Sequence, residues 1–300
     1  MSTLDVPRDP PSSSPDASSL DALLPAQMAA KAEGVGVTKA NLDAVSLFAL
    51  AVLAGAFISL GAIFATTVSA GAGDLAFGLV RLMAGLAFSL GLILVIVGGA
   101  ELFTGNALIV MAWASRKVSS ALVLRNWAIV YAGNFVGALP TAGVMFVSGQ
   151  YTFGHGSVGL AALTIGNTKA GLDFVPAVVL GVMCNALVCL AVWLAFSART
   201  TTDRILAIVP PIAAFVAIGF EHSVANMYFI PEAIAIRTWA PAGFWASIDR
   251  APTDFSNLTV EAFLVRNLLP VTIGNVIGGA VMVGVVYWFV YLRRRGSSTP

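Results

Sequence analysis

Two polar clusters interrupt long apolar stretches of this sequence, and they carry the side chains best suited to chemistry. The first reads GAELFTGN over residues 99–106, and the second reads GFEHSVAN over residues 219–226. Both place a glutamate two residues, and an asparagine seven residues, after the first glycine. An ionisable side chain at membrane depth is costly and marks a functional site by default. The two clusters, 120 residues apart, therefore predict a polar site in a hydrophobic protein.

His222 in the second cluster changes its charge more readily near neutral pH than the other ionisable residues of the clusters. In a narrow apolar passage it can lend a positive charge or a proton to a passing carboxylate. The alternative is a structural histidine that is hydrogen-bonded to Thr104 or to a backbone carbonyl. The residue types alone leave both interpretations open.

The other polar residues of the clusters also have two interpretations. Glu101 and Glu221 can carry protons, or they can accept hydrogen bonds from exposed N–H groups of the loops. We favour the acceptor role. Thr104, together with Asn275 from a later apolar segment, can offer donors to a ligand or can join neighbouring helices. A broken helix points the positive end of its dipole at the break, which favours an anion.

The composition places these clusters in a membrane protein. Of the 300 residues, 58% are hydrophobic and 10% are charged, whereas average soluble domains carry about 25% charged residues. The net charge of +1, without a basic stripe or a zinc-ligand spacing, excludes a nucleic-acid partner. We expect no cofactor, no metal and no enzymatic activity, because neither H-E-x-x-H nor a nucleophile elbow occurs. Cys184 and Cys189 are expected to be buried and unpaired.

Hydropathy predicts six membrane-spanning segments. Two of them, 79–115 and 205–237, exceed the roughly 20 residues that a bilayer requires, and each contains one polar cluster. We expect both to be helices broken at membrane depth, where irregular backbone must line a cavity or be buried in protein. The other spans are expected near residues 44–70, 124–148, 173–198 and 264–292.

The chain divides further outside the spans. Residues 1–24 are rich in Pro, Ser and Asp and are expected to be a disordered tail. Residues 25–43 are expected to form an amphipathic helix on the cytoplasmic membrane surface, with a partly ordered leader as the alternative that composition leaves open. The six-helix transmembrane domain then covers residues 44–292, and residues 293–300 form a short C-terminal tail.

The distribution of Lys and Arg predicts the orientation in the membrane. Ten of these residues flank the spans on the side of the termini, and five lie on the other side. The positive-inside rule therefore places both termini in the cytoplasm, in the inner membrane of the cell. Two loops, near 149–172 and 238–263, are expected to face outward, and Lys169 lies in the first of them.

An internal repeat relates the two halves of the chain. Besides the clusters, the third span carries Asn134 followed by Gly137, and the sixth carries Asn275 followed by Gly278. Spans one to three thus resemble spans four to six in order. Because three is odd, the second unit must cross the membrane upside down, as in many transporters and channels. We expect an all-α fold with an inverted 3+3 repeat.

Four motifs resemble those of one known family: GAELFTGNALIV (99–110), GVMCNALVCLAVWLAFSAR (181–199), GFEHSVANMYFIP (219–231) and NLLPVTIGNVIGGA (267–280). In order and spacing the chain resembles the formate/nitrite transporter family over residues 25–293. The resemblance implies an aquaporin-like fold and a homopentamer with one pore in each protomer. It also implies transport of a small monovalent weak-acid anion, with formate as the first expectation and nitrite or hydrosulfide as the alternative. Protons and membrane lipid are the further partners expected.

The resemblance implies roles for single residues at the centre of the pore. Thr104 matches the loop threonine of the family, His222 its central histidine and Asn275 the asparagine of its sixth helix. The outer constriction of the pore matches Phe88 and Phe215.

Other positions match lining or supporting residues. The inner constriction matches Leu92 and Phe103, and a pore-lining position of the fourth span matches Val188. Asn185 matches the partner of the family glutamate, which is Glu221 in this sequence. Two further residues that we expect to support the loops are Asn106 and Asn226.

The outer vestibule has one expected feature and one departure. Lys169 matches the vestibule lysine of the family, in agreement with its expected outer position. Glu232 stands where an apolar residue is expected, and it can add negative charge near the outer mouth. The alternative from another class is a neutral-solute channel of the aquaporin type, but neither cluster contains the Asn-Pro-Ala that such channels use.

Overall fold

The computed structural model of the chain describes residues 22–73 and 75–293, and these residues form helices and no strands. Six helices are long and apolar enough to cross a membrane, so the chain is a multi-pass membrane protein. Of the predicted tails, 1–21 and 294–300 lie outside the described residues. The six spanning helices are α2 (Ala44–Ser69), α3 (Phe77–Gly98), α5 (Ser120–Val147), α7 (Phe174–Ser197), α8 (Thr201–Ile218) and a last helix (Ala262–Tyr291) that contains α11 (Leu269–Val276) and α12 (Val286–Tyr291).

Both of the long segments are broken at their polar clusters, as predicted. Helix α3 stops at Gly99, where φ is +81°, and a short turn (Gly105–Ile109) leads into α4 (Val110–Ala114). Helix α8 stops at Gly219, where φ is +94°, and α9 (Ser223–Trp239) follows. A positive φ is unfavourable for residues with a Cβ atom, so glycine is the residue that ends both helices.

Helix α1 (Pro25–Ala40) confirms the expected helix but not its expected position on the membrane surface. Its apolar face, with Met28 and Ala32, is buried against residues of α4 and of the last helix. An ion pair of 2.6 Å from Lys117 to Glu33 also holds it on the protein. An apolar helix face can be buried by protein as well as by lipid, and the pattern of residues does not distinguish the two.

The two expected outward loops connect spanning helices, and both contain short helices that the sequence analysis did not predict. The first, near 149–172, contains α6 (Ser157–Ala170), and the second, near 238–263, contains α10 (Ala242–Ile248). A helix satisfies its own backbone N–H and C=O groups, which suits a segment packed on a bundle rather than exposed to water.

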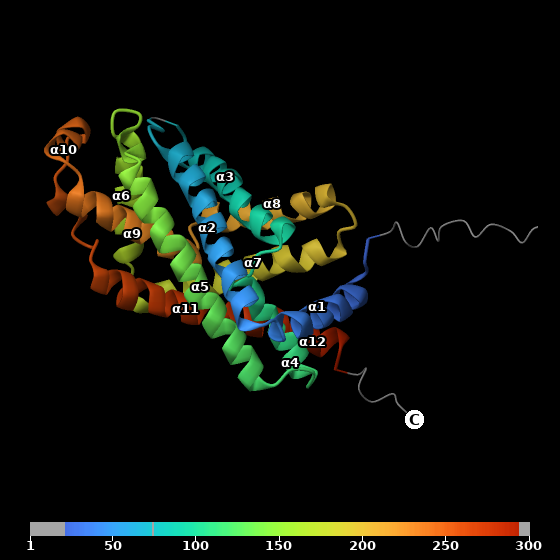
Figure 1. Ribbon diagram of the computed structural model, residues 1–300. Helices are drawn as coiled ribbons and strands as arrows, with labels where there is room; N and C mark the ends of the chain where they lie inside the picture. Colours follow the sequence, from blue (N-terminus) through green and yellow to red (C-terminus); the bar gives the residue numbers. More distant parts are fainter. Residues whose placement is uncertain (1–21, 74, 294–300) are drawn as a thin grey trace, which may run out of the picture.

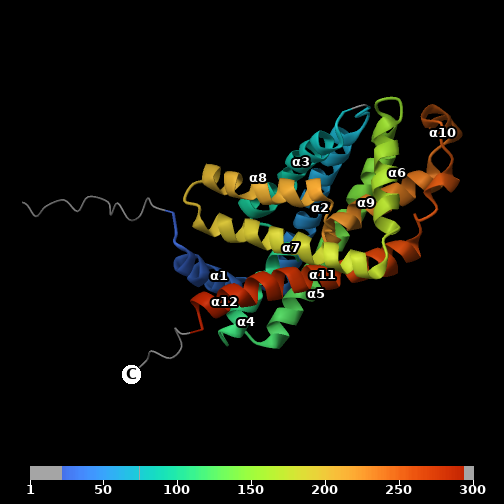
Figure 2. The same ribbon diagram turned by 180° about the vertical axis from the view of Figure 1, so that it is seen from behind.

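The helices divide between two ends of the bundle. Figures 1 and 2 show α1, α4 and α12 at one end, and α6, α9 and α10 at the opposite end. We call these ends the α1 side and the α6 side.

Glycines allow two pairs of spanning helices to pack closely. A Cβ atom on Gly137 would overlap the carbonyl oxygen of Val52, and one on Gly278 would overlap that of Val182. Helices α2 and α5, and α7 and the last helix, therefore approach backbone to backbone.

Candidate functional site

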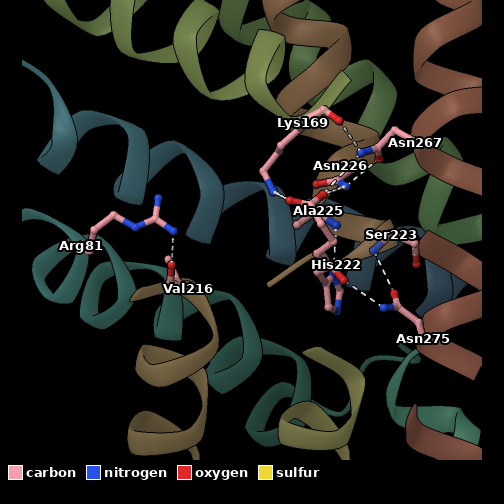
Figure 3. A network of polar contacts seen from close by, with 10 residues as sticks. Arg81, Lys169, Val216, His222, Ser223, Ala225, Asn226, Asn267 and Asn275 are labelled. Carbon is pink, nitrogen blue, oxygen red and sulfur yellow. Dashed lines mark hydrogen bonds and ion pairs between the residues drawn. The ribbon is translucent and has the colours of Figure 1, made fainter. Parts of the chain in front are cut away.

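A hydrogen bond between Thr104 and His222 joins the two helix breaks. The hydroxyl oxygen of Thr104 lies 3.0 Å from Nε2 of His222, and both residues are buried. At the other ring nitrogen, Nδ1 of His222 accepts the backbone N–H of Ala225 at 3.0 Å (Figure 3). A neutral imidazole carries one N–H, so the ring proton lies on Nε2 and is donated to Thr104. The structure thus brings together the two residues that were predicted to meet.

Asn275 holds the second break in place from the last helix (Figure 3). Its Oδ1 accepts the backbone N–H of Ser223 at 2.9 Å, and its Nδ2 donates to the carbonyl oxygens of Gly181 and Glu221 at 2.8 and 2.9 Å. All three bonds are made by a fully buried amide. This geometry supports the interpretation of Asn275 as a contact between helices and loop.

Asn134 repeats this arrangement at the first break. Its Oδ1 accepts the backbone N–H of Phe103 at 2.9 Å, and its Nδ2 donates to the carbonyl oxygens of Ala51 and Glu101 at 2.8 and 2.9 Å. The two asparagines thus bind corresponding atoms of the two breaks, although the sequence showed only their spacing to glycine. A buried polar group of this kind must be satisfied, and here every donor and acceptor of the amide has a partner.

The carboxylate of Glu221 is held by a lysine and by amides. Nζ of Lys169 lies 2.8 Å from it, and Nδ2 of Asn226 donates to it at 2.7 Å. Asn267 accepts a second bond from Asn226 and donates to the carbonyl oxygen of Lys169 at 2.8 Å (Figure 3). This environment supports the acceptor role for the glutamate.

Glu101 has the corresponding environment at the first break. Nζ of Lys39 lies 2.6 Å from its carboxylate, and Nδ2 of Asn106 donates to it at 2.7 Å. Asn126 accepts a bond from Asn106 and donates to the carbonyl oxygen of Lys39, both at 3.0 Å. The predicted supporting role of Asn106 therefore fits its contacts.

Sequence reasoning missed Lys39, Asn126 and Asn267, although each has a sequence signal. Lys39 stands four residues before Asp43, as Lys169 stands four residues before Asp173. Similarly, the two missed asparagines stand eight residues before the two that hold the breaks. These equal spacings become recognisable once the first half of the chain is aligned with the second half.

A cavity of about 450 Å³ opens on the α6 side beside His222. The rings of Phe88 and Phe215 meet edge to face in its lining, with centroids 5.5 Å apart, and their role as an outer constriction stays a prediction. Lys169 also lines this cavity. Arg81 is a lining residue that sequence reasoning missed, and its guanidinium donates to the carbonyl oxygens at the C-terminal end of α8 (Figure 3).

A second cavity, of about 730 Å³, opens on the α1 side. Leu92 lines it and Phe103 does not, so the pairing of these two residues in an inner constriction stays a prediction. Leu102 lines the cavity instead, and the ring of Phe103 packs against Tyr131 and Trp127, with centroids 4.9 and 6.2 Å away. The side chains of Leu102 and Phe103 point to different sides of the first break. The hydrogen bond from the N–H of Phe103 to Asn134 fixes the backbone in this orientation.

Three further expectations meet a different structure. Asn185 does not hold Glu221 and instead donates to the carbonyl oxygens of Thr104 and Asn275, at 3.2 and 2.6 Å. Val188 is buried in α7 and lines neither cavity, so its pore-lining role stays a prediction. Glu232 is 3% exposed and also lines neither cavity, so a contribution of its charge to the outer mouth stays a prediction.

Comparisons with known proteins agree on one family. Residues 26–289 match the family described as Formate/nitrite transporter. The chain is 48% identical to "Formate channel FocA" of Escherichia coli (strain K12) over 273 residues, which cover 91% of this chain and 96% of that protein. It is 40% identical to "Formate channel FocB" of the same strain, with 92% and 98% covered. A solved structure, "Pentameric formate channel with formate bound", has a TM-score of 0.79 at 45% identity and covers 83% of this chain and 98% of its own. With the broken helices and their matched asparagines, these similarities mean that the chain belongs to the formate/nitrite transporter family.

Proposed function

We propose that this chain is a channel for a small monovalent weak-acid anion, and that formate is the anion it carries. The observation that carries the proposal is the hydrogen bond between Thr104 and His222, which joins two broken helices beside a cavity with cationic lining. Two relatives named formate channels, 48% and 40% identical, support the choice of anion. Membership in a transporter family supports a non-enzymatic role.

Capture of the anion begins in the α6-side cavity. Its lining contains two cationic residues, Lys169 and Arg81, and one acidic residue, Glu221. A cleft with positive lining and apolar walls concentrates anions at its mouth. Phe88 and Phe215 then form an apolar step, where the anion has to give up water. Loss of hydration raises the cost of the charge and therefore favours protonation of the anion.

The bond between His222 and Thr104 provides donors just beyond this step. Because Thr104 accepts the Nε2–H of the ring, the hydrogen of its own hydroxyl is available to an oxygen of the anion. Hydrogen bonds to a carboxylate are charge-assisted, and they offset part of the lost hydration. A proton relay by His222 requires a second proton on the ring, taken up at Nδ1 with loss of the bond to Ala225, before the Nε2 proton passes to the anion by way of Thr104. Formate that gains this proton continues along the pathway as the neutral acid, and the ring returns to its neutral form.

We propose that five protomers assemble, each with its own pore, and that both termini lie in the cytoplasm of an inner-membrane protein surrounded by lipid. The pentameric description of the similar solved structure and the distribution of Lys and Arg support these statements. The matched contacts of Asn134 and Asn275 support an inverted repeat. In this arrangement residues 44–292 form the transport domain, and the α1 side faces the cytoplasm.

Uptake into proteoliposomes that contain a pH dye tests the proposal, with formate, nitrite and hydrosulfide supplied in parallel. Wild type should take up formate with a rate that saturates. His222→Ala should lower the rate at least about tenfold, the loss expected for about 1.4 kcal/mol of stabilisation. His222→Gln keeps an N–H donor but cannot titrate, so it separates hydrogen bonding from proton relay.

A matched pair of threonine variants serves as the control. Thr104→Val should impair uptake, whereas Thr164→Val should not, because Thr164 lines the same cavity and bonds only to its own helix at Leu160. Uptake of nitrite alone would change the anion but not the pathway. Folded pentamers that pass none of the three anions would refute the proposal, and passage of neutral solutes alone would favour the aquaporin-type alternative.

A further inference from the structure

The α1-side cavity carries more positive charge than the α6-side cavity does. Its lining includes Lys31, Lys39 and Arg204, with Glu101 as the one acidic residue of the lining. Lys39 is paired with Glu101 at 2.6 Å. Lys31 and Arg204 form no ion pair with another residue in the described part of the chain. The cavity therefore has two cationic groups that lack an anionic partner within that part of the chain.

The protein holds Lys31 at the mouth of this cavity. Its ammonium group donates to the carbonyl oxygen of Phe196, near the end of α7, at 3.0 Å. An ammonium group has three N–H donors, so two remain for a ligand. Burial, and then the nearby positive charges of Arg204 and Arg199, lower the pKa of Lys31. Like charges held close together are costly, and an anion between them would relieve that cost.

The walls of the cavity suit a small anion. Leu92, Val95 and Ile96, which follow one another along α3, give the lining apolar side chains, and Leu102 from the first break adds another. Apolar walls of low dielectric strengthen the field of nearby charges and raise the local concentration of counter-ions. The lining contains Lys31 and Arg204 and no carboxylate besides Glu101, so its charge favours an anion over a cation.

We propose that Lys31 and Arg204 form an anion-recruiting site on the α1 side, which binds a small monovalent carboxylate before it passes Leu92 and Leu102. The inference rests on the proposed function and deepens it, because it gives the pathway a second entrance site on the side opposite Lys169. Each cation should act on anions that enter from the α1 side and leave entry from the α6 side unchanged.

Formate uptake by vesicles of known orientation tests this site. All proteins carry Ala22→Cys, an exposed position beside α1, for attachment of biotin, and the native Cys184 and Cys189 are buried. Streptavidin then separates vesicles, prepared at low protein-to-lipid ratio, whose α1 side faces outward from those in which it faces inward. The initial rate of formate uptake against concentration is measured in both fractions.

Lys31→Gln and Arg204→Gln should each raise the half-saturating formate concentration about threefold in the α1-outward fraction, as expected for loss of one screened charge. The other fraction should keep the wild-type value. Lys31→Arg and Arg204→Lys should restore wild-type behaviour. Arg116→Gln removes an exposed charge near α4 that lies outside the cavity lining, so it should change neither fraction.

Two results would overturn the inference while leaving the proposed function intact. One is an unchanged half-saturating concentration in the α1-outward fraction of both Gln variants. The other is an equal change in both fractions, which would indicate a general effect on the channel. Wild-type protein that takes up no formate in either fraction would overturn the proposed function, and this inference with it.

Discussion

Replacement of Asn275 by leucine should destabilise the protein by releasing the second helix break. The buried amide makes three hydrogen bonds, to the N–H of Ser223 and to the carbonyl oxygens of Gly181 and Glu221. At about 0.6–1.5 kcal/mol for each bond, the loss is about 2–4 kcal/mol. Leucine has the same branched arrangement of side-chain heavy atoms, so it leaves no cavity, and any overpacking by its bulkier methyl groups would add to the cost of the lost hydrogen bonds.

The measurement is the free energy of unfolding of the purified protein in mixed micelles, titrated with a denaturing detergent and followed by circular dichroism. Asn134→Leu is the matched variant, because its amide makes the corresponding three bonds at the first break. It should cost about the same, 2–4 kcal/mol. Thr272→Val, in the same helix as Asn275, loses two bonds, one to Tyr131 and one within its own helix, and at the same rate should cost less, about 1–3 kcal/mol.

Formate uptake is the second readout of these variants. Without Asn275 the N–H of Ser223 is released, and the neighbouring His222 is no longer held at the start of α9, so uptake should fall as well. A cost below about 0.5 kcal/mol for Asn275→Leu, within the range of ordinary surface substitutions, would refute the reasoning. So would a large cost for Asn275→Leu beside no cost for Asn134→Leu.

Three other predictions concern packing, charge and capping. Gly278→Ala places a methyl group against a carbonyl oxygen of α7 and should destabilise by about 1–3 kcal/mol, whereas Gly143→Ala meets open space and should be neutral or stabilising in thermal unfolding. Lys169→Gln leaves the buried carboxylate of Glu221 without its cation and should lower the thermal midpoint, and Glu221→Gln in the same protein should recover part of the loss. Hydrogen bonds from backbone N–H groups in the first turn of α2 lower the pKa of Asp43. That stabilisation is present above the ordinary carboxyl pKa and is lost as the pH falls through the lowered value, so hydrogen-exchange protection should decrease there.

Much of the architecture could be predicted because the signals are local. Runs of about 20 apolar residues give the spans, and the glycines at 99 and 219 end helices through their own backbone preference. The polar clusters follow these glycines directly, so the place of each break was also predictable. The contact between Thr104 and His222 was one of the interpretations offered for the histidine, and the family resemblance placed both residues at the centre of the pore.

The directions of side chains could not be predicted, since they depend on contacts between distant segments. Phe103 and Leu102 are neighbours, yet Leu102 faces the α1-side cavity and Phe103 packs against aromatic rings of α5. Asn185 lies on α7 and could have faced either break, and it bonds to Thr104. Glu232 is buried because α9 turns that face toward the interior.

The sequence by itself determined the six spans, the two breaks and the residues that carry the chemistry, because hydropathy, glycine and ionisable groups act within a few residues of chain. Only the tertiary structure decided which charges are paired and which are not. Lys39 is neutralised by Glu101 across 62 residues of sequence, whereas Lys31 remains beside Arg204. A charge interacts with whatever lies within a few ångströms in space, and that neighbourhood exists only after the helices have packed.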